Sequence, residues 1–471
     1  MTRLTGTLWL LALLLHSGVA TCAELRAGAA KSNITPAIGT VLNGGTQPVV
    51  STHVHDELWA RALVLDDGQT RLAIVVIDCC LVERPLFDRA KELIRAHSGL
   101  DPERVMISCT HTHSGGSAAG AHLSEPDPEY QRLLVLRIAD AVRCAVQNLA
   151  PARAAWGAGS VPQHVFCRRI RLKPGSKYVN QLGQGDQVVK MNWDSPHPDD
   201  LEMAGPVDPE LFVLSVRHAD GRPLALLASY SLHYVGGVGP GHISADYFGV
   251  FAERMVDLLG ARGQDPELIA CLSNGTSGDI NNIDFRAVRA ERKPYEQIRR
   301  VAEDVAQEAL RVEKGLSYKA DIPLASAFTG LSLRTRRPLA AEIEAARQLV
   351  AGRPARELRT WSEIYAREQL ILADYPESMT IPLQVFRVGG AVLAAWPGEI
   401  FASTGLELKG RSPVKPLVNI GLANGWYGYI PPPEQHRLGA YETWRGRTSL
   451  LEESATVKML DTLVHLIEKV K

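Results

Sequence analysis

Short apolar segments of strand character alternate with segments of helical character along most of this chain of 471 residues. Residues 60–66 and 72–79 are rich in Val, Ile and Leu and are joined by the turn 66–68, so they predict a β-hairpin. Residues 86–96 then have helical periodicity, and residues 104–109 return to strand character. Because strands interleave with helices, we expect an α/β fold with mixed β-sheets flanked by helices.

The same alternation continues towards the C-terminus. Further strands are expected at 211–217, 224–232, 268–273, 381–388, 391–396 and 417–420. Further helices are expected at 128–149, 245–259, 294–313, 340–349 and 454–470. Residues 171–208, which are rich in Gly, Asp, Pro and Asn, predict a long surface loop of the kind that often covers a site, and residues 336–375 predict a small helical cap or hairpin. Without internal repeats or an evident linker, the sequence favours a single domain over residues 24–471.

Composition restricts the partners and the compartment. The net charge of −1 lacks the basic excess of a nucleic-acid-binding protein. Residues 1–23 are typical of a secretory signal peptide, with Arg3 ahead of the apolar run 8–15, so we expect an exported protein, periplasmic or secreted. A lipoprotein anchor at Cys22 is the alternative. No segment is long enough to predict a transmembrane helix after signal removal, and no pattern fixes an oligomeric state.

The cysteines predict neither a disulfide framework nor a cysteine-based metal site. Six cysteines follow the signal segment at irregular spacing, and Cys79 and Cys80 are expected to be buried where a strand ends. No C-x-x-C pattern occurs. Any metal must therefore be held by histidine and oxygen ligands.

The run Cys109–Gly116, with the sequence CTHTHSGG, directly follows the strand expected at 104–109. If that strand continues, alternation places His111 and His113 on the same side. The glycines at 115 and 116 then allow a sharp turn and close approach to a ligand. Two imidazoles in this position predict half of a metal site, and tetrahedral zinc needs at least one more protein ligand from distant sequence.

Four other polar, glycine-containing clusters follow or adjoin predicted strands. They are residues 228–237, 273–282, 396–399 and 424–431. Each key residue has a simple structural explanation when taken alone: His233 as a hydrogen-bonded residue, Glu399 as a carboxylate at a helix start, and Tyr429 as a packing residue. Their joint pattern favours a shared site, because α/β folds build their sites where strands stop.

In order and spacing, these motifs resemble the catalytic domain of the neutral/alkaline non-lysosomal ceramidase family. The resemblance runs from about Arg26 to Glu442 and includes residues 27–36 and 55–64. The most specific matches are residues 110–116, 278–279, 397–399 and 424–429. The resemblance implies a ceramidase-like fold and a Zn²⁺ cofactor.

The resemblance also implies roles for single residues. The zinc ligands would be His111, His233, Glu399 and Tyr429. It places His113 near the reacting carbonyl, and it also matches Tyr441 and Arg168. His113 or a nearby carboxylate would accept or relay a proton, and Tyr441 or Arg168 would stabilise a developing oxyanion. Arg169 is an equal neighbour for the last of these roles. Zinc lowers the pKa of bound water to about 7, so the reaction implied is hydrolysis of an amide or ester.

The sequence departs from the family pattern at the position of a serine that is argued to be a nucleophile or to bind the substrate. The run here is Gly278-Asp279-Ile280-Asn281-Asn282, so Asn281 stands in place of that serine. An amide can only hydrogen-bond a polar group of the substrate, and Asn281 and Asp279 are the expected substrate-binding residues. We also expect the chain to lack the β-sandwich domain that follows in ceramidases. Both departures argue against a long-chain ceramide as substrate.

We therefore expect an exported zinc hydrolase acting on an amide or ester of a small lipid or saccharide. One alternative is a carbohydrate-active enzyme, whether deacetylase, esterase or glycosidase, in which residues 171–208 and Asn281 bind sugar hydroxyls. The other is a non-catalytic zinc- or ligand-binding protein that lost turnover with its serine.

Overall fold

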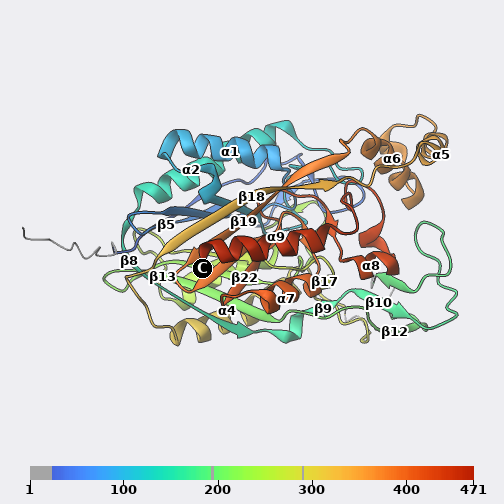
Figure 1. Ribbon diagram of the computed structural model, residues 1–471. Helices are drawn as coiled ribbons and strands as arrows, with labels where there is room; N and C mark the ends of the chain where they lie inside the picture. Colours follow the sequence, from blue (N-terminus) through green and yellow to red (C-terminus); the bar gives the residue numbers. More distant parts are fainter. Residues whose placement is uncertain (1–23, 192–195, 289–290) are drawn as a thin grey trace, which may run out of the picture.

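The computed structural model describes residues 24–191, 196–288 and 291–471 (Figure 1). The signal segment expected at residues 1–23 lies outside the described residues. Within the described ranges, no helix combines the length and the apolar character needed to cross a membrane.

A mixed eight-stranded sheet forms the centre of the described structure (Figure 1). In their order across the sheet, its strands are β16 (Ile269–Asn274), β14 (Pro223–Tyr230), β13 (Glu210–His218), β8 (Ala150–Ser160), β1 (Arg26–Asn33), β5 (Trp59–Asp66), β6 (Arg71–Ile77) and β7 (Val105–Cys109). The hairpin expected from residues 60–79 is confirmed as β5 and β6. The pairs β6–β7 and β14–β16 are parallel and the other neighbours are antiparallel.

Helices cover one face of this sheet. They are α1 (Arg84–Ser98), α2 (Pro128–Gln147), α3 (Asp246–Leu258) and α4 (Glu296–Lys314). Alternation along β13 shows how the two faces separate: Leu211 and Val213 pack with α3 and α4, whereas Phe212 and Leu214 point to the other side. Strand β13 is therefore apolar on both faces, as expected for a sheet covered on both sides.

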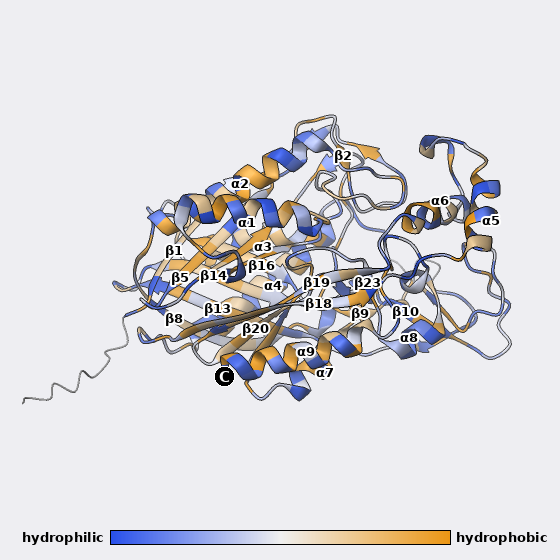
Figure 2. Ribbon diagram, turned by 45° about the horizontal axis from the view of Figure 1, so that its top comes forward, coloured by the Kyte–Doolittle hydropathy of each residue, from blue (hydrophilic) through white to orange (hydrophobic). Residues whose placement is uncertain are grey.

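The other face packs on a four-stranded sheet, which α7 (Ala402–Arg411) and α9 (Ala455–Val470) cover in turn. The strands of this sheet, in order, are β18 (Leu324–Arg334), β19 (Ser378–Val388), β20 (Ala391–Ala395) and β22 (Leu417–Ile420). Figure 2 shows the apolar strands enclosed between amphipathic helices. The result is four layers in the order helix, sheet, sheet, helix, which confirms the expected α/β class with mixed sheets.

Two central strands, β1 and β8, have sequences that do not indicate strand structure. Their residues are RAGAAKSN and APARAAWGAGS, rich in Ala and Gly, which have low strand propensity. The small side chains allow close packing: a Cβ at Gly28 would lie 2.1 Å from the Ala145 carbonyl oxygen of α2. Pairing with neighbours on both sides and contact with α2 override local propensity here.

The segment 171–208 is more ordered than a loop, which corrects the sequence interpretation. It contributes to a three-stranded antiparallel sheet of β10 (Arg169–Leu172), β11 (Val189–Met191) and β12 (Asp200–Met203). Lys190 is buried there, with its Nζ 3.1 Å from Asp200 Oδ1. The Gly, Asp, Pro and Asn content of this segment is typical of turns and does not indicate its short strands.

The helical hairpin expected within residues 336–375 is confirmed as α5 (Ala340–Val350) and α6 (Trp361–Ala373), which project together at the edge of the molecule (Figure 1).

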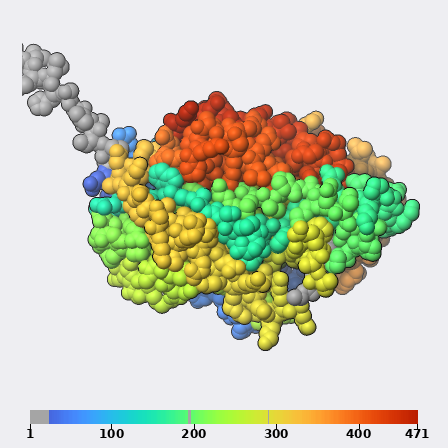
Figure 3. Space-filling model, turned by 90° about the horizontal axis from the view of Figure 1, so that it is seen from below, coloured from blue at the N-terminus to red at the C-terminus, as the bar shows by residue number. Residues whose placement is uncertain are grey.

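The remaining strands form two-stranded pairs: β2 (Val41–Leu42) with β3 (Val49–Val50), β4 (His53–Val54) with β15 (His242–Ile243), β9 (Phe166–Cys167) with β17 (Ile280–Asn281), and β21 (Glu399–Ile400) with β23 (Tyr429–Ile430). A short helix, α8 (Pro433–Leu438), follows β23. In the space-filling view of Figure 3, the C-terminal residues cover one long side of the molecule.

The six cysteines of the described residues are all unpaired. Cys79 and Cys80 are fully buried just after β6, which confirms their expected place at a strand end.

Asp246, at the start of α3, makes stability depend on pH. Its carboxylate accepts hydrogen bonds from the backbone N–H groups of Val235, Gly236 and Tyr247, yet burial raises its pKa from 3.8 to about 6. The folded state therefore binds more protons than the unfolded state between these two values, and the free energy of unfolding falls as pH rises through that window. We expect Asp246→Asn to reduce the loss of stability between pH 4 and pH 7 by up to about 3 kcal/mol, measured by urea denaturation at both values. Equal pH dependence in the variant and the wild type would contradict this assignment.

Candidate metal centre

The polar residues that follow several strands gather at one end of the two stacked sheets. Backbone hydrogen bonds join the sheets there: the Asn424 N–H donates to the Ile107 oxygen at 2.7 Å, and the Gly421 N–H donates to the Asn274 oxygen at 2.8 Å. This arrangement brings together the ends of β7, β14, β16, β20 and β22. The expectation that the strand-end clusters share one region is confirmed.

The Cys109–Gly116 run enters this region without continuing the strand, so the alternation of side chains along a strand does not apply to it. The strand ends at Cys109, and His111 has a left-handed φ of 72° while its N–H donates to the Cys79 oxygen. The chain turns at His113 and Ser114 and bends at Gly115, and neither Gly115 nor Gly116 has a positive φ. Gly116 is instead needed for packing, because a Cβ there would lie 2.7 Å from the Tyr130 ring.

Three buried side chains converge beside this run. His111, His233 and Glu399 are 2%, 1% and 5% exposed, and their ligand atoms all lie within 4.8 Å of one another. The Nε2 atoms of the two histidines are 2.9 Å apart. Glu399 Oε2 lies 3.3 Å from His111 Nε2 and 3.6 Å from His233 Nε2. This buried group can bind a metal ion.

The hydrogen bonds of the outer ring nitrogens decide which atoms face the centre. His111 Nδ1 donates to the Cys80 carbonyl oxygen, and His233 Nδ1 donates to the Ser277 carbonyl oxygen, each at 2.9 Å. A proton on each Nδ1 leaves each Nε2 with a lone pair, and burial, His111 and Arg168 lower the pKa of His233, which keeps that ring neutral. Two lone pairs and a carboxylate oxygen that has no hydrogen-bond partner among the described residues thus face one another. A cation between them would remove that repulsion, and this donor set suits zinc.

Glu399 is held from two sides. It lies in β21, which pairs in parallel with β23 so that Glu399 is opposite Tyr429. Its Oε1 accepts a hydrogen bond from Trp426 Nε1 at 3.1 Å. The pKa of Glu399 is lowered despite its burial, in part by the Trp426 N–H and the Arg168 charge, so the carboxylate stays charged.

Tyr429, the fourth expected ligand, lines the same cavity of about 310 Å³ as His111, His113 and Glu399. Burial raises the pKa of its phenol well above the usual value, although neighbouring Arg168 lowers it in part. The phenol therefore supplies an oxygen donor at the wall of the cavity, next to the three converging groups.

His113 also reaches the centre. Its Nε2 lies 3.1 Å from His111 Nε2, its ring stacks on Tyr234 at 3.6 Å between centroids, and it packs against the backbone of Gly44. Burial lowers the pKa of His113 well below its usual value, and the neighbouring His111 and Arg168 add to that effect. The ring is therefore neutral, and its surroundings disfavour the protonated form.

The two neighbouring arginines share one buried ion-pair partner and differ in their other contacts. Glu442 accepts from Arg168 Nε at 2.9 Å and from Arg169 Nη1 at 2.6 Å. The Arg168 guanidinium then lies 5.2 Å from the centre of the Tyr429 ring. Arg169 instead donates to the backbone oxygens of Gln435 and Gly439, away from the cavity. Of the two candidates, Arg168 is the one beside Tyr429, and its role in stabilising an oxyanion stays a prediction.

Tyr441 lines the cavity together with His122, and its hydroxyl is 3.2 Å from His122 Nε2. Burial raises the pKa of Tyr441 well above its usual value. The phenol therefore stays protonated and can donate a hydrogen bond into the cavity.

The two expected substrate-binding residues have other contacts. Asp279 is buried and its Oδ1 accepts the Ala402 N–H at the start of α7, at 2.8 Å, so it supports the segment that follows Glu399. Asn281 Oδ1 accepts the Ile283 N–H at 2.9 Å, within its own turn. The substrate-binding role of both residues stays a prediction.

Comparison with known proteins shows which proteins this chain resembles. No family model matches it. The neutral ceramidase of Pseudomonas aeruginosa (strain PAO1) is 24% identical over 449 residues, an alignment that covers 83% of this chain and 64% of that protein. The chain is a distant homologue of neutral ceramidase. It spans less than two thirds of the length of this relative.

Solved ceramidase structures share the fold. The crystal structure of neutral ceramidase from Pseudomonas aeruginosa has a TM-score of 0.70 at 18% identity and covers 95% of this chain and 75% of its own. A ceramidase complexed with C2 has a TM-score of 0.69 at 17% identity, covering 95% and 76% respectively.

Several residues that line the cavity of this ceramidase relative had no role in the sequence-based prediction, and four of them illustrate why. They are Gly44, Cys80, His122 and Trp426. Trp426 lies inside the tyrosine-rich segment and was the easiest to find. Gly44 and His122 follow no predicted strand, and nothing in the sequence connects them to the centre. Contacts between distant segments bring them there.

Trp426 provides a prediction for metal affinity. Trp426→Phe keeps an aromatic ring but removes the N–H that orients Glu399, and we expect zinc affinity to fall by about 10–100-fold. Competition against a chelator would measure the change. Trp59→Phe, in β5, is the matched control because its ring packs near Lys31, and it should leave affinity unchanged. Equal zinc affinities of Trp426→Phe and the wild type would show that the hydrogen bond does not tune the metal.

Proposed function

We propose that this protein is a zinc-dependent hydrolase that cleaves an amide or ester bond. His111, His233, Glu399 and Tyr429 would hold the metal. The observation that carries the proposal is the pair of Nε2 lone pairs, 2.9 Å apart and beside a buried carboxylate oxygen, whose opposite nitrogens both donate to carbonyl oxygens. Distant homology to neutral ceramidase, an amide-cleaving hydrolase, supports the same chemistry.

A zinc ion held by these groups would supply Lewis-acid polarisation of a substrate carbonyl and would acidify water in the cavity. The chain's own residues supply the remaining functions. His113 faces the cavity as a neutral imidazole, and the proposed role is to accept and relay a proton once negative charge that develops in the cavity offsets its lowered pKa. Arg168 stays charged through its pair with Glu442, and Tyr441 stays protonated, so both can stabilise negative charge that develops on the acyl oxygen.

The aromatic residues around the cavity favour a second candidate substrate class. Tyr441 and His122 line the cavity, and Trp361 at the start of α6 packs beside them: its ring centroid lies 5.9 Å from those of Tyr441 and Trp444 and 6.2 Å from that of His122. Aromatic rings that border a polar cavity can stack on sugar rings as well as on acyl chains. An acylated saccharide is therefore the second candidate, and a ceramide-like N-acyl lipid is the first because of the homology.

One experiment tests the function and separates the substrates. Purified protein would be analysed for metal by mass spectrometry and then assayed with p-nitrophenyl acetate, a short-chain ceramide and N-acetylglucosamine oligomers. We expect about one zinc at this centre and hydrolysis of at least one substrate that a chelator removes. Protein that binds zinc but hydrolyses none of them supports the non-catalytic alternative, and protein that binds no zinc refutes the proposed centre.

The variant Asn281→Ser tests the position where the sequence departs from ceramidases. If Asn281 sets the substrate, we expect the serine variant to gain ceramide hydrolysis relative to p-nitrophenyl acetate hydrolysis. The ratio of kcat/KM for the two substrates is the measurement. An unchanged ratio would place specificity elsewhere in the cavity.

A further inference from the structure

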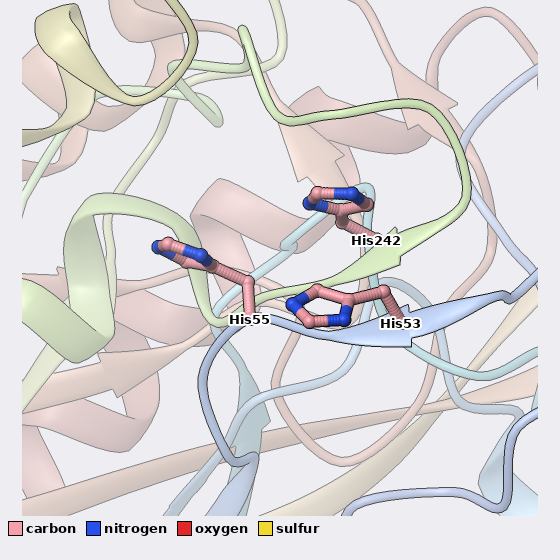
Figure 4. Close-up of side chains that lie close together, drawn as sticks. All are labelled: His53, His55 and His242. Carbon is pink, nitrogen blue, oxygen red and sulfur yellow. The ribbon is translucent and has the colours of Figure 1, made fainter.

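A second group of histidines lies at the surface of the described structure, apart from the buried centre. The ligand atoms of His53, His55 and His242 all lie within 4.8 Å of one another. His53 and His55 are exposed and His242 is half-buried. Figure 4 shows the three imidazoles gathered beside the paired strands β4 and β15, with their nitrogens open to the same space.

The backbone fixes the positions of all three. His53 and His242 are direct partners in the parallel β4–β15 pair, and His55 follows His53 by two residues, so alternation brings the three side chains to one face. The pairing continues beyond the two strands. The Thr52 N–H donates to the Gly241 oxygen at 2.8 Å and the His55 N–H donates to the Ile243 oxygen at 3.0 Å. The cluster is therefore built by main-chain geometry and not by a chance meeting of mobile side chains.

Tyr295, at the start of α4, orients two of the rings. Its hydroxyl lies 2.5 Å from His242 Nδ1, and its ring stacks on His55 at 3.6 Å between centroids and 13° between planes. When the phenol oxygen accepts from His242 Nδ1, the Nε2 of that ring keeps a lone pair for a metal. A partner on the outer nitrogen is the usual companion of a metal-binding histidine.

We propose that His53, His55 and His242 form a second metal site, which binds Zn²⁺ through three imidazoles with the remaining position open to water. Neutral imidazole suits zinc and similar divalent transition metals, and three such ligands are sufficient for a tetrahedral ion with one open position. The three ligand atoms already lie close to one another, and two of them are on exposed side chains that can adjust by rotation.

The site would also fix one wall of the groove that leads to His113. The glycine-rich loop Gly236–Gly241 ends directly before His242, and this loop lines a groove of about 840 Å³ together with His113, Tyr234 and His242. Gly236, Gly237 and Gly241 have positive φ values, which glycine adopts without the steric cost that other residues pay. A metal that joins His242 to β4 would hold the end of this loop against the rest of the fold.

Counting bound zinc tests the proposal. The full-length protein would be dialysed against Zn²⁺ and its zinc measured by mass spectrometry. We expect the double variant His53→Ala/His242→Ala to bind one zinc fewer than the wild type. The double variant His97→Ala/His465→Ala, which removes two exposed histidines outside the cluster, should bind as many as the wild type. Equal zinc content of the cluster variant and the wild type would overturn the second site.

The comparison of zinc contents still tests the second site if the buried centre binds no zinc. In a His233→Ala background, removal of His53 and His242 should still lower the zinc content by one equivalent, because the two sites share no ligand. Hydrogen–deuterium exchange then tests the effect on the loop. Exchange of residues 236–242 should slow on zinc addition in the wild type and not in the cluster variant. Zinc binding without slower exchange would refute the role in holding the loop.

Discussion

Replacing His233 by alanine is expected to abolish hydrolysis, with kcat lower by about 10³-fold or more, because one of the converging metal ligands is lost. The other proposed ligands, His111, Glu399 and the phenol of Tyr429, should hold zinc far less tightly, because an imidazole donor is lost and burial raises the pKa of the phenol well above its usual value. The zinc content of the buried centre should fall in parallel with activity towards p-nitrophenyl acetate. His233 has an ordinary backbone conformation, whereas His111 has a positive φ, so His233→Ala is the cleaner test.

The matched control for this variant is His97→Ala. His97 is exposed at the end of α1, and its replacement should change neither the zinc content nor kcat. Urea denaturation of both variants would show whether the fold is kept. If His233→Ala retained wild-type activity, the zinc mechanism would be wrong even for a protein that contains zinc.

Replacing Glu442 by glutamine is expected to lower the free energy of unfolding by about 3–5 kcal/mol, the largest stability effect that we predict from a single ion-pair change. Glu442 is fully buried and is the shared partner of Arg168 and Arg169. Glutamine has nearly the same size but no charge, so two buried guanidinium groups lose their counter-charge. Equilibrium denaturation in urea measures the change.

The control is a glutamate of an exposed pair. Glu407 lies 3.4 Å from Arg411 one helical turn along α7, and its side chain is 54% exposed. Glu407→Gln should cost no more than about 0.5 kcal/mol, because water screens this pair. A similar small effect for Glu442→Gln would contradict the structural importance of the buried network. Loss of activity in Glu442→Gln at temperatures where it remains folded would further indicate that Glu442 positions Arg168.

Strongly patterned segments of this chain could be predicted from sequence, and weakly patterned ones could not. The β5–β6 hairpin and the helices α1, α2 and α9 follow from apolar periodicity, which is a local property. Strands β1 and β8 consist mainly of Ala and Gly and are held by their neighbours on both sides. Their strand structure comes from tertiary packing that overrides propensity.

The candidate centre shows the same division. His111, His233 and Glu399 each follow a strand, and that pattern together with the ceramidase resemblance was sufficient to group them before their distances were known. The sequence could not decide between Arg168 and Arg169, since both residues have the same charge and adjacent positions. Both pair with Glu442, and only their other contacts distinguish them: Arg168 lies over Tyr429, and Arg169 donates to backbone oxygens of the segment 435–439.

By itself, the sequence determined the α/β class, the order of most elements and the set of polar residues placed at strand ends. The tertiary structure decided which of these residues meet, which nitrogen of each histidine faces the centre, and that β4 and β15 bring three surface histidines together. The physical reason is that periodicity and turn chemistry act over a few residues. Lone-pair direction, burial and the meeting of residues 53 and 242 depend instead on how distant segments pack.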